Sequence, residues 1–256
     1  MTVLTRNEKS RYHRHLILDS IGEAGQEKIK NASVLVIGAG GLGCPVLQYL
    51  TATGAGRIGV MDDDKVDISN LQRQVFYGMN DLGKHKAIVA TSQMKKMNSN
   101  VDFDLFSIRI TYDNALDFAA KFDVLVDCTD NLAARYVLSD AAVLTGKPLV
   151  HASVYKCQGQ VSVFAYKDGP SYRCLFPNQN ANQKERSEVL GIYSITPGII
   201  GLIQANEVIK IITGAGDVLS GKLVIYNALT NQFNYINIAR DESNFNKNDL
   251  IKLFKN

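Results

Sequence analysis

Long apolar segments are missing from this sequence of 256 residues. No apolar run stands at the N-terminus, and no stretch of about eighteen apolar residues occurs, so we expect neither secretion nor a membrane span. Cysteines are also few. The four that occur are widely scattered and form no C-x-x-C pair. Because this usage is typical of reducing compartments, we expect a cytoplasmic protein.

A strong charge of either sign is missing as well. The net charge is +3 and the pI is about 8.5, which gives no reason to expect nucleic acid as a partner. The hydrophobic fraction of 46% is that of an ordinary globular core. The length allows one large α/β domain, or one domain with a modest extension.

A glycine-rich turn organises the chain. Four apolar residues at Val34–Ile37 predict a fully buried parallel strand, and the apolar run Val46–Leu50 predicts a helix shortly after it. The residues between them at G-x-G-x-x-G spacing are Gly38, Gly40 and Gly43. Glycine permits a tight turn close to a phosphate, and the start of the helix supplies free N–H groups. The pattern alone is weak, but its strand–turn–helix setting favours a nucleotide site.

Acidic residues follow the next predicted strand, Arg57–Met61. Asp62 lies about 20 residues past the glycine turn, the spacing at which an acid binds ribose hydroxyls. Aspartate is also a common turn residue, but Asp62, Asp63 and Asp64 in a row exceed what a turn needs. To this point the pattern fits NAD as well as ATP.

Basic residues in the following segment separate the two nucleotides. A triphosphate carries more charge than a dinucleotide and needs arginine or lysine beside it. Arg73, Lys84 and Lys86 are candidates for this work, although each by itself is more often a surface charge.

A further buried strand, Asp123–Asp127, ends in Cys128-Thr-Asp-Asn131. Ligands of open α/β sheets bind at the carboxyl ends of strands, so Asp62, Asp64 and Asp130 are expected on one rim with the glycine turn. A carboxylate facing a triphosphate is sensible only with Mg²⁺ between them. Asp130 is the best candidate for that role.

The remaining pattern predicts an α/β fold: a Rossmann-like, doubly wound, mainly parallel sheet, continued by antiparallel strands and preceded by an N-terminal helical arm. Helices are predicted near 26–32, 83–97, 113–121, 132–146, 198–212 and 249–255, with a break at Gly22–Gly25, and further strands near 101–110, 151–155, 160–166, 222–226 and 232–238. The expected parts are the arm at 1–30, the nucleotide-binding part at 31–150, a docking part of the same domain at 151–240 and a tail at 241–256.

Several motifs together resemble the ThiF/MoeB family, the bacterial relatives of the ubiquitin-activating enzymes. The match covers residues 8–238. It rests on GAGGLG, the run D-x-D-x-V-D-x-S-N-L-x-R-Q from Asp62 to Gln74, G-K-x-K-A, D-C-T-D-N, R-Y-x-R-H at Arg11–His15 and the segment Ser171–Pro177.

The resemblance implies a reaction and its participants. Such proteins bind ATP and Mg²⁺ and adenylate the C-terminal glycine carboxylate of a small ubiquitin-like sulfur-carrier protein ending in Gly-Gly, with release of pyrophosphate. By matching motif, the nucleotide-binding residues are Gly38, Gly40, Gly41, Gly43, Asp62, Asp64, Asn70, Arg73, Lys86 and Asn131, with Asp62 on the ribose. Asp130 would hold the magnesium. Arg14 would act on the triphosphate of the neighbouring subunit, which implies a homodimer, although composition alone favours a solvated basic face there.

The chain departs from the family in its thiols. Many relatives hold a structural zinc with two C-x-x-C pairs, but the first pair here is Ser171 and Cys174, and the second is missing near Asp241–Phe245. One thiol cannot make a tetrahedral site, so we expect no zinc. A polar segment at 178–190 resembles the family's loop over the carrier tail, with an idle surface loop as the alternative. Ser187 stands where many relatives have a cysteine.

Two other functions stay open from the sequence. The glycine turn and Asp62 allow an NAD-dependent oxidoreductase, which leaves Arg73, Lys86 and Asp130 without purpose. The second alternative is a non-catalytic module that binds ubiquitin-like proteins, although every residue that the resemblance assigns to adenylation is present. The cysteine that some relatives use for persulfide chemistry is replaced by Ser187, and a rhodanese-like domain is missing. These two absences favour thiamine synthesis slightly over molybdopterin synthesis as the pathway.

Overall fold

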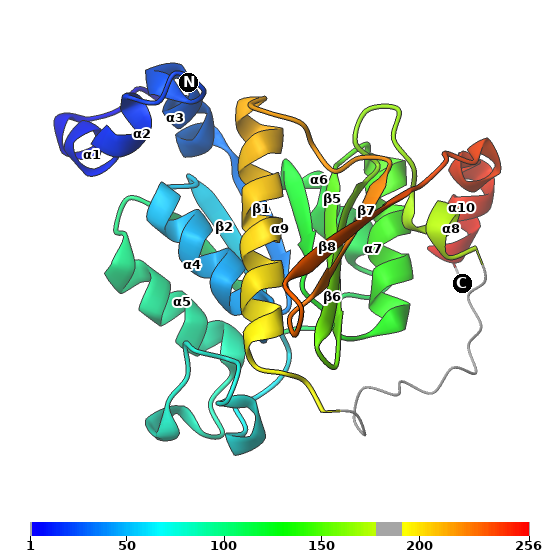
Figure 1. The fold of residues 1–256 in the computed structure, drawn as a ribbon, viewed down its shortest axis with the longest axis horizontal. Coiled ribbons are helices and arrows are strands. Elements are labelled where there is room, and N and C mark those ends of the chain that lie inside the picture. The colour runs from blue at the N-terminus through cyan, green and yellow to red at the C-terminus, as the bar shows by residue number, and fades with distance from the viewer. Residues whose placement is uncertain (1, 178–190, 256) are drawn as a thin grey trace.

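The computed structural model describes residues 2–177 and 191–255, so the predicted loop at 178–190 and Ser187 lie outside the described residues. The described chain forms one eight-stranded sheet in the order β3-β2-β1-β4-β5-β6-β7-β8 (Figure 1). Its strands are β1 Ser33–Ile37, β2 Arg57–Met61, β3 Asp102–Phe106, β4 Val124–Asp127, β5 Leu149–Tyr155, β6 Gln158–Phe164, β7 Lys222–Asn227 and β8 Gln232–Asn237. The α-helices are α1 Arg6–Arg11, α2 His13–Leu16, α3 Gly22–Asn31, α4 Gly43–Thr53, α5 Lys86–Met97, α6 Ala115–Ala120, α7 Leu132–Thr145, α8 Tyr172–Leu175, α9 Ile195–Thr213 and α10 Lys247–Leu253.

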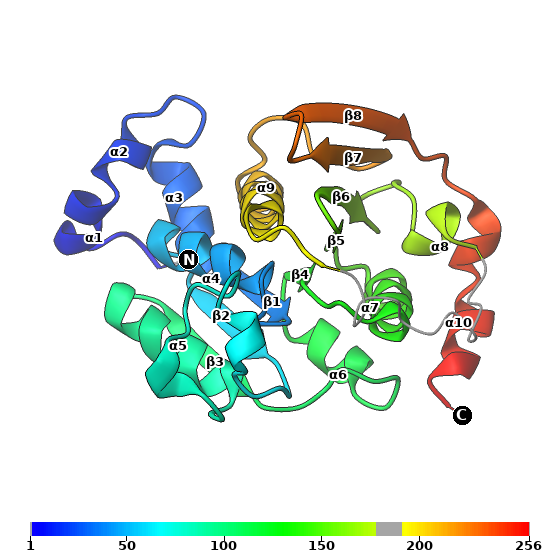
Figure 2. The same ribbon diagram turned by 60° about the horizontal axis from the view of Figure 1, so that its bottom comes forward.

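The parallel half is doubly wound, as predicted. Alternate residues of β1 enter two separate cores: Val34 and Val36 face α4, α5 and α9, whereas Leu35 and Ile37 face α6 and α7. Figure 2 shows these two groups of helices on opposite faces of the sheet. Because strands β1, β2 and β4 are buried on both faces, they read in the sequence as continuous apolar runs.

The antiparallel half is crossed by α9. Strand β6 pairs antiparallel with β5 and β7, and β8 forms the sheet edge. A Cβ on Gly159 of β6 would overlap the side chain of Ile200, so glycine lets α9 lie directly on the sheet. By length and composition α9 could cross a membrane, with 19 residues and a mean hydropathy of 1.3. In this fold it is a core helix that packs on α4, β5 and β6.

The N-terminal arm packs on the far ends of two helices. Thr5 and Glu8 form a capping box that starts α1. Gln26 of α3 donates to the carbonyl of Thr53 at the end of α4, and Arg11 donates to the carbonyl of Met97 at the end of α5. These contacts fix the arm at the end of the sheet opposite the glycine turn (Figure 1).

Two predicted boundaries were wrong. The break expected at Gly22–Gly25 instead opens α3, because α3 packs against α9 and this tertiary contact outweighs the low helix propensity of glycine. The strand expected over 101–110 stops at Phe106, where β2, its one partner strand among the described residues, ends at Met61.

Sulfur hydrogen bonds dock the C-terminal tail. The Sγ of Cys174 lies 3.4 Å from the Oγ of Ser171 and 3.4 Å from the backbone N of Asp241, which donates to it. The side-chain amide of Asn244 also donates to this sulfur, at 3.8 Å. Farther along the tail, the ring of Phe254 packs edge-on against Tyr112 at 4.8 Å. The positions at which the family's zinc ligands are expected therefore meet around one thiol.

This arrangement predicts that a zinc site can be built. The triple variant Ser171→Cys, Asp241→Cys and Asn244→Cys is expected to bind one Zn²⁺ per chain and to gain thermal stability, because four thiolates then surround one point. Elemental analysis and thermal unfolding with and without chelator would measure both. The unchanged protein, expected to be free of zinc, is the control. A triple variant without stoichiometric zinc would contradict the proposed convergence.

Candidate active site

The glycine turn is closed by backbone contacts. Gly38 has φ of 97°, which favours glycine, and a Cβ there would lie 2.6 Å from the carbonyl oxygen of Cys128. A Cβ on Gly43 would overlap the carbonyl oxygen of Gly38. Helix α4 begins at Gly43 without a side-chain cap. The N–H of Cys44 already donates to the carbonyl of Gly40 and Pro45 has no N–H, so an anion would meet the N–H groups of the turn that precede Cys44. The predicted strand, glycine turn and helix are therefore present, with close backbone contacts that require glycine at Gly38 and Gly43.

Two other glycines of the turn leave space for neighbouring side chains. A Cβ on Gly40 would lie 3.5 Å from the Nε2 of Gln74, and one on Gly41 would lie 3.4 Å from the Cγ of Arg73. Arg73 therefore lies beside the turn, and its Nη1 donates to the carbonyl of Ser69 at 3.1 Å. Pro197, in the first turn of α9, lies near the same position, 3.2 Å from a Cβ on Gly41.

Asp62, at the end of β2, supports the turn. One carboxylate oxygen accepts the N–H of Ala39 at 2.7 Å and the other accepts the N–H of Asp64 at 2.9 Å. Burial raises the pKa of Asp62, while the nearby charge of Lys86 opposes this shift. Each oxygen keeps a further lone pair, so the carboxylate can still accept from a ribose hydroxyl.

Lys86 is held by an ion pair. Its Nζ lies 2.8 Å from the Oδ2 of Asp64, and its side chain is 7% exposed whereas that of Asp64 is 61% exposed. Asp64 is therefore the partner of the predicted phosphate-binding lysine. Lys84, the other candidate, is more exposed and pairs with Asp81 at 3.0 Å. Lys86 also lies close enough to Asp62 for its charge to oppose the raised pKa of that carboxyl group, so Lys86 flanks the glycine turn.

Asn70 and Asn131 stabilise the two loops that carry the charged residues. The backbone carbonyl of Asn70 accepts the N–H groups of Arg73 and Gln74. The side chain of Asn131 caps α7 by accepting the N–H of Ala134 at 3.0 Å. Asp130, immediately before this cap, is exposed.

The structure therefore brings the predicted rim together. The β4 loop with Asp130 touches the glycine turn through Cys128 and Gly38, and Asp62, Arg73 and Lys86 flank the same turn. Arg14 does not join them. The arm docks at the C-terminal end of α4, which has 11 residues and so places the arm about 16 Å from the turn.

The acidic cluster of Asp62, Asp63 and Asp64 has its oxygens within 4.8 Å of one another. Each carboxylate already has a partner: backbone N–H groups for Asp62, Arg109 for Asp63 and Lys86 for Asp64. The three carboxylates of this cluster are therefore engaged by groups of the protein itself.

Sequence analysis missed two buried groups behind the rim. Tyr77 is 6% exposed, and its hydroxyl donates to the carbonyl of Ala39 at 2.6 Å. This hydrogen bond holds the backbone of the glycine turn. Asp127 and His151 form a fully buried pair at 2.7 Å. For the pair of Asp127 and His151, the signal in the sequence was a polar residue in each of two buried strands, which are neighbours in the sheet.

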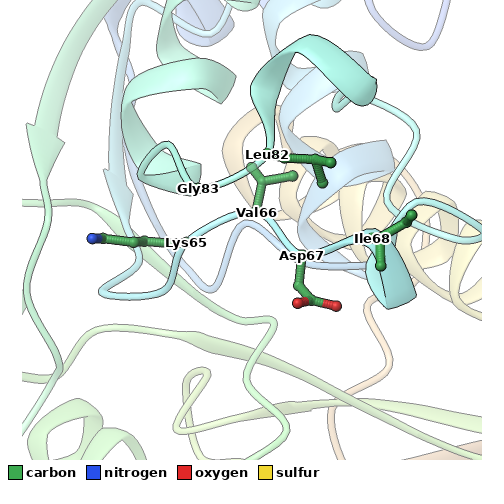
Figure 3. A pocket seen from close by; sticks show the side chains of 6 residues that line it. All are labelled: Lys65, Val66, Asp67, Ile68, Leu82 and Gly83. Atoms are coloured by element: carbon green, nitrogen blue, oxygen red, sulfur yellow. The ribbon is translucent and has the colours of Figure 1, made fainter.

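An open hollow lies on the segment between β2 and α5 (Figure 3). It is lined by Lys65, Val66, Asp67, Ile68, Leu82 and Gly83. None of these residues belongs to the glycine turn or the β4 loop, so this hollow is not the nucleotide site.

Curated relatives extend over nearly the whole chain. A sulfur carrier protein adenylyltransferase of Thermus thermophilus is 43% identical, over 93% of this chain and 90% of the relative. A protein of Porphyra purpurea named probable molybdopterin-synthase adenylyltransferase is 41% identical, over 94% and 64%. The adenylyltransferase and sulfurtransferase MOCS3 of Xenopus laevis is 45% identical, over 92% of this chain but only 52% of its own length.

Solved structures agree on the fold. The crystal structure of Escherichia coli MccB with ATP superposes with a TM-score of 0.80 at 23% identity, over 93% of this chain and 74% of that one. The same enzyme with succinimide gives a TM-score of 0.81. The profile of the ThiF family matches residues 12–247, and with the relatives above it shows that the chain belongs to the ThiF family.

Proposed function

We propose that this protein uses ATP and Mg²⁺ to adenylate the C-terminal glycine carboxylate of a small ubiquitin-like sulfur-carrier protein, with release of pyrophosphate. The observation that carries the proposal is the convergence of Arg73, Lys86 and the β4 loop that contains Asp130 on one glycine turn. The relatives' names describe the same class of reaction. None of the names given above describes an oxidoreductase, and a dinucleotide would leave these three residues unused.

The arrangement fits the chemistry of the reaction. A carboxylate is already a nucleophile, so the enzyme needs neither a covalent residue nor a strong base. It must align the carboxylate with the α-phosphorus and stabilise charge on the leaving pyrophosphate. The uncapped start of α4, Arg73 and Lys86 supply positive charge for this purpose. Mg²⁺ bound through Asp130 would neutralise further phosphate charge.

An apolar surface between α9 and β8 fits a carrier protein. The pairings Tyr226 with Phe233 and Val224 with Tyr235 place both aromatic rings of β8 on the α9 side of the sheet. Phe233 and Tyr235 are exposed, as are Ile195 and Leu202 of α9. Exposed apolar side chains on these two elements make this face a candidate protein interface.

We also propose a homodimer in which Arg14 serves the partner's site. The arm docks at the far ends of α4 and α5, which separates Arg14 from its own glycine turn. Exposed apolar side chains occur on the arm and on the segment between β2 and α5, as a dimer interface would require. They are Ile17, Leu18, Ile68, Val75, Met79 and Leu82.

Four free cysteines agree with a reducing, cytoplasmic location.

Carrier-dependent ATP–pyrophosphate exchange tests the reaction. Arg73→Ala and Asp130→Ala are each expected to lower exchange by about 100-fold or more, because each removes charge stabilisation. Lys84→Ala, which removes an exposed lysine paired with Asp81, is the matched control and should stay near the unchanged protein. Running thiamine-type and molybdopterin-type carriers side by side identifies the pathway. ATP binding without exchange for any carrier would favour a non-catalytic module.

Subunit mixing tests the trans role of Arg14. Arg14→Ala and Arg73→Ala are each expected to be inactive alone. After random exchange about half of the dimers are mixed, each with one of two sites intact, so about a quarter of the normal activity should return. Mixing Arg14→Ala with the double variant lacking both arginines is the control and should restore nothing. A monomer in solution, or no recovery despite mixed dimers, would refute the trans arrangement.

The apolar surface predicts a carrier-specific defect. Tyr235→Glu is expected to raise the KM for the carrier about tenfold, because it places a charge in an apolar contact, while the KM for ATP stays the same. Asn234→Glu adds the same charge to the opposite face of β8 and is the control. Equal effects of the two variants would show that this face does not receive the carrier.

A further inference from the structure

A buried acid–histidine pair lies directly behind the β4 loop. Asp127 is the last residue of β4, and His151 is its register partner on β5. Both side chains have no exposed surface, and the Nδ1 of His151 lies 2.7 Å from the Oδ2 of Asp127. Burying a charged group is costly unless it is paired, so this pair is expected to serve a specific purpose.

Burial and hydrogen bonding favour one protonation state of the pair. Burial lowers the pKa of His151 despite the neighbouring carboxylate. Burial also tends to raise the pKa of Asp127, but hydrogen bonding from His151, the charge of Arg135 and Thr129 together bring it below the ordinary value. A neutral imidazole therefore donates from Nδ1 to an ionised carboxylate, which locks the carboxylate in one orientation.

The second oxygen of Asp127 shapes the loop. Its Oδ1 accepts the N–H of Thr129 at 3.0 Å and the hydroxyl of Thr129 at 2.7 Å, which closes a side-chain turn. The carbonyl of Asp127 accepts from Gln204 at 2.8 Å, and that of Thr129 accepts from Arg135 at 3.3 Å. The backbone is thereby held on both sides up to Thr129.

Asp130 is the next residue, and its side chain is exposed. Its position relative to the glycine turn depends on the turn before it, because Cys128 of that turn touches Gly38. We propose that His151 is a positioning residue that acts through Asp127 and Thr129 to hold Asp130 in place for Mg²⁺ at the nucleotide site. This inference rests on the proposed function, which assigns the metal to Asp130.

Binding of a non-hydrolysable ATP analogue, with Mg²⁺ and with EDTA, tests the inference by calorimetry. His151→Leu keeps the side-chain volume but removes the donor. It is expected to lose about tenfold of the Mg²⁺-dependent affinity, the usual effect of removing a group behind a metal ligand, with no change in EDTA. His151→Asn places an N–H donor at the same δ position and should stay within about threefold of the unchanged protein.

Thr129→Val gives a second route to the same turn. It removes one bond to Asp127 and should lower the Mg²⁺-dependent affinity less than His151→Leu does. The two changes should be non-additive in the double variant, because they act through one carboxylate. If His151→Leu fails to fold, an unchanged Mg²⁺ dependence in Thr129→Val overturns the inference. A His151→Leu protein that has a lower Tm but normal Mg²⁺ dependence of ATP-analogue binding also overturns the inference.

Asp130→Ala separates this inference from the proposed function. Loss of the Mg²⁺-dependent affinity in Asp130→Ala, without any effect of His151→Leu, refutes the positioning role alone. Normal Mg²⁺ dependence in Asp130→Ala refutes the metal role of Asp130, and the inference falls with it. The exchange assay measures adenylation independently of both results.

Discussion

The close approach of two backbone segments underlies the whole site. Gly38 leaves β1 with a positive φ, and no atom larger than hydrogen fits between it and the carbonyl of Cys128. This contact joins the glycine turn to the β4 loop, so the start of α4 and Asp130 lie at one place. Asp62 and Tyr77 then hold Ala39, the residue between the first two glycines, through its N–H and its carbonyl. A side chain at Gly38 would separate the glycine turn from the loop that carries Asp130, the proposed magnesium ligand.

Helix α9 connects the two halves of the molecule. Its first turn touches Gly41 through Pro197, and its next turn rests on Gly159 of β6 through Ile200. Farther along, Gln204 donates to the carbonyl of Asp127 behind the β4 loop. One rigid helix therefore contacts the glycine turn, the β4 loop and the sheet next to the proposed carrier surface. A carrier on that surface would meet an element already fixed to the nucleotide site.

The charged groups of the site are held by local pairing. Lys86 loses most of its hydration on folding, and its ion pair with Asp64 compensates part of that cost. The buried Asp127 is compensated in the same way by hydrogen bonds from His151 and Thr129 and by the nearby Arg135. Because Lys86 and Asp127 each have a fixed partner, these parts of the site are organised before any ligand binds, and little reorganisation of them is left for the reaction.

Local sequence determined most of the elements and the composition of the rim. Apolar runs such as Val34–Ile37 and Arg57–Met61 form strands at the predicted residues, because a strand buried on both faces must be apolar throughout. The rim residues were predictable because carboxyl ends of parallel strands share one edge. Tertiary structure alone decided three things: that Gly22–Gly25 is helical against α9, that Asp64 pairs with Lys86, and that His151 meets Asp127. Each depends on contacts between segments distant in the chain, and no local periodicity encodes which polar side chains will face each other across strands.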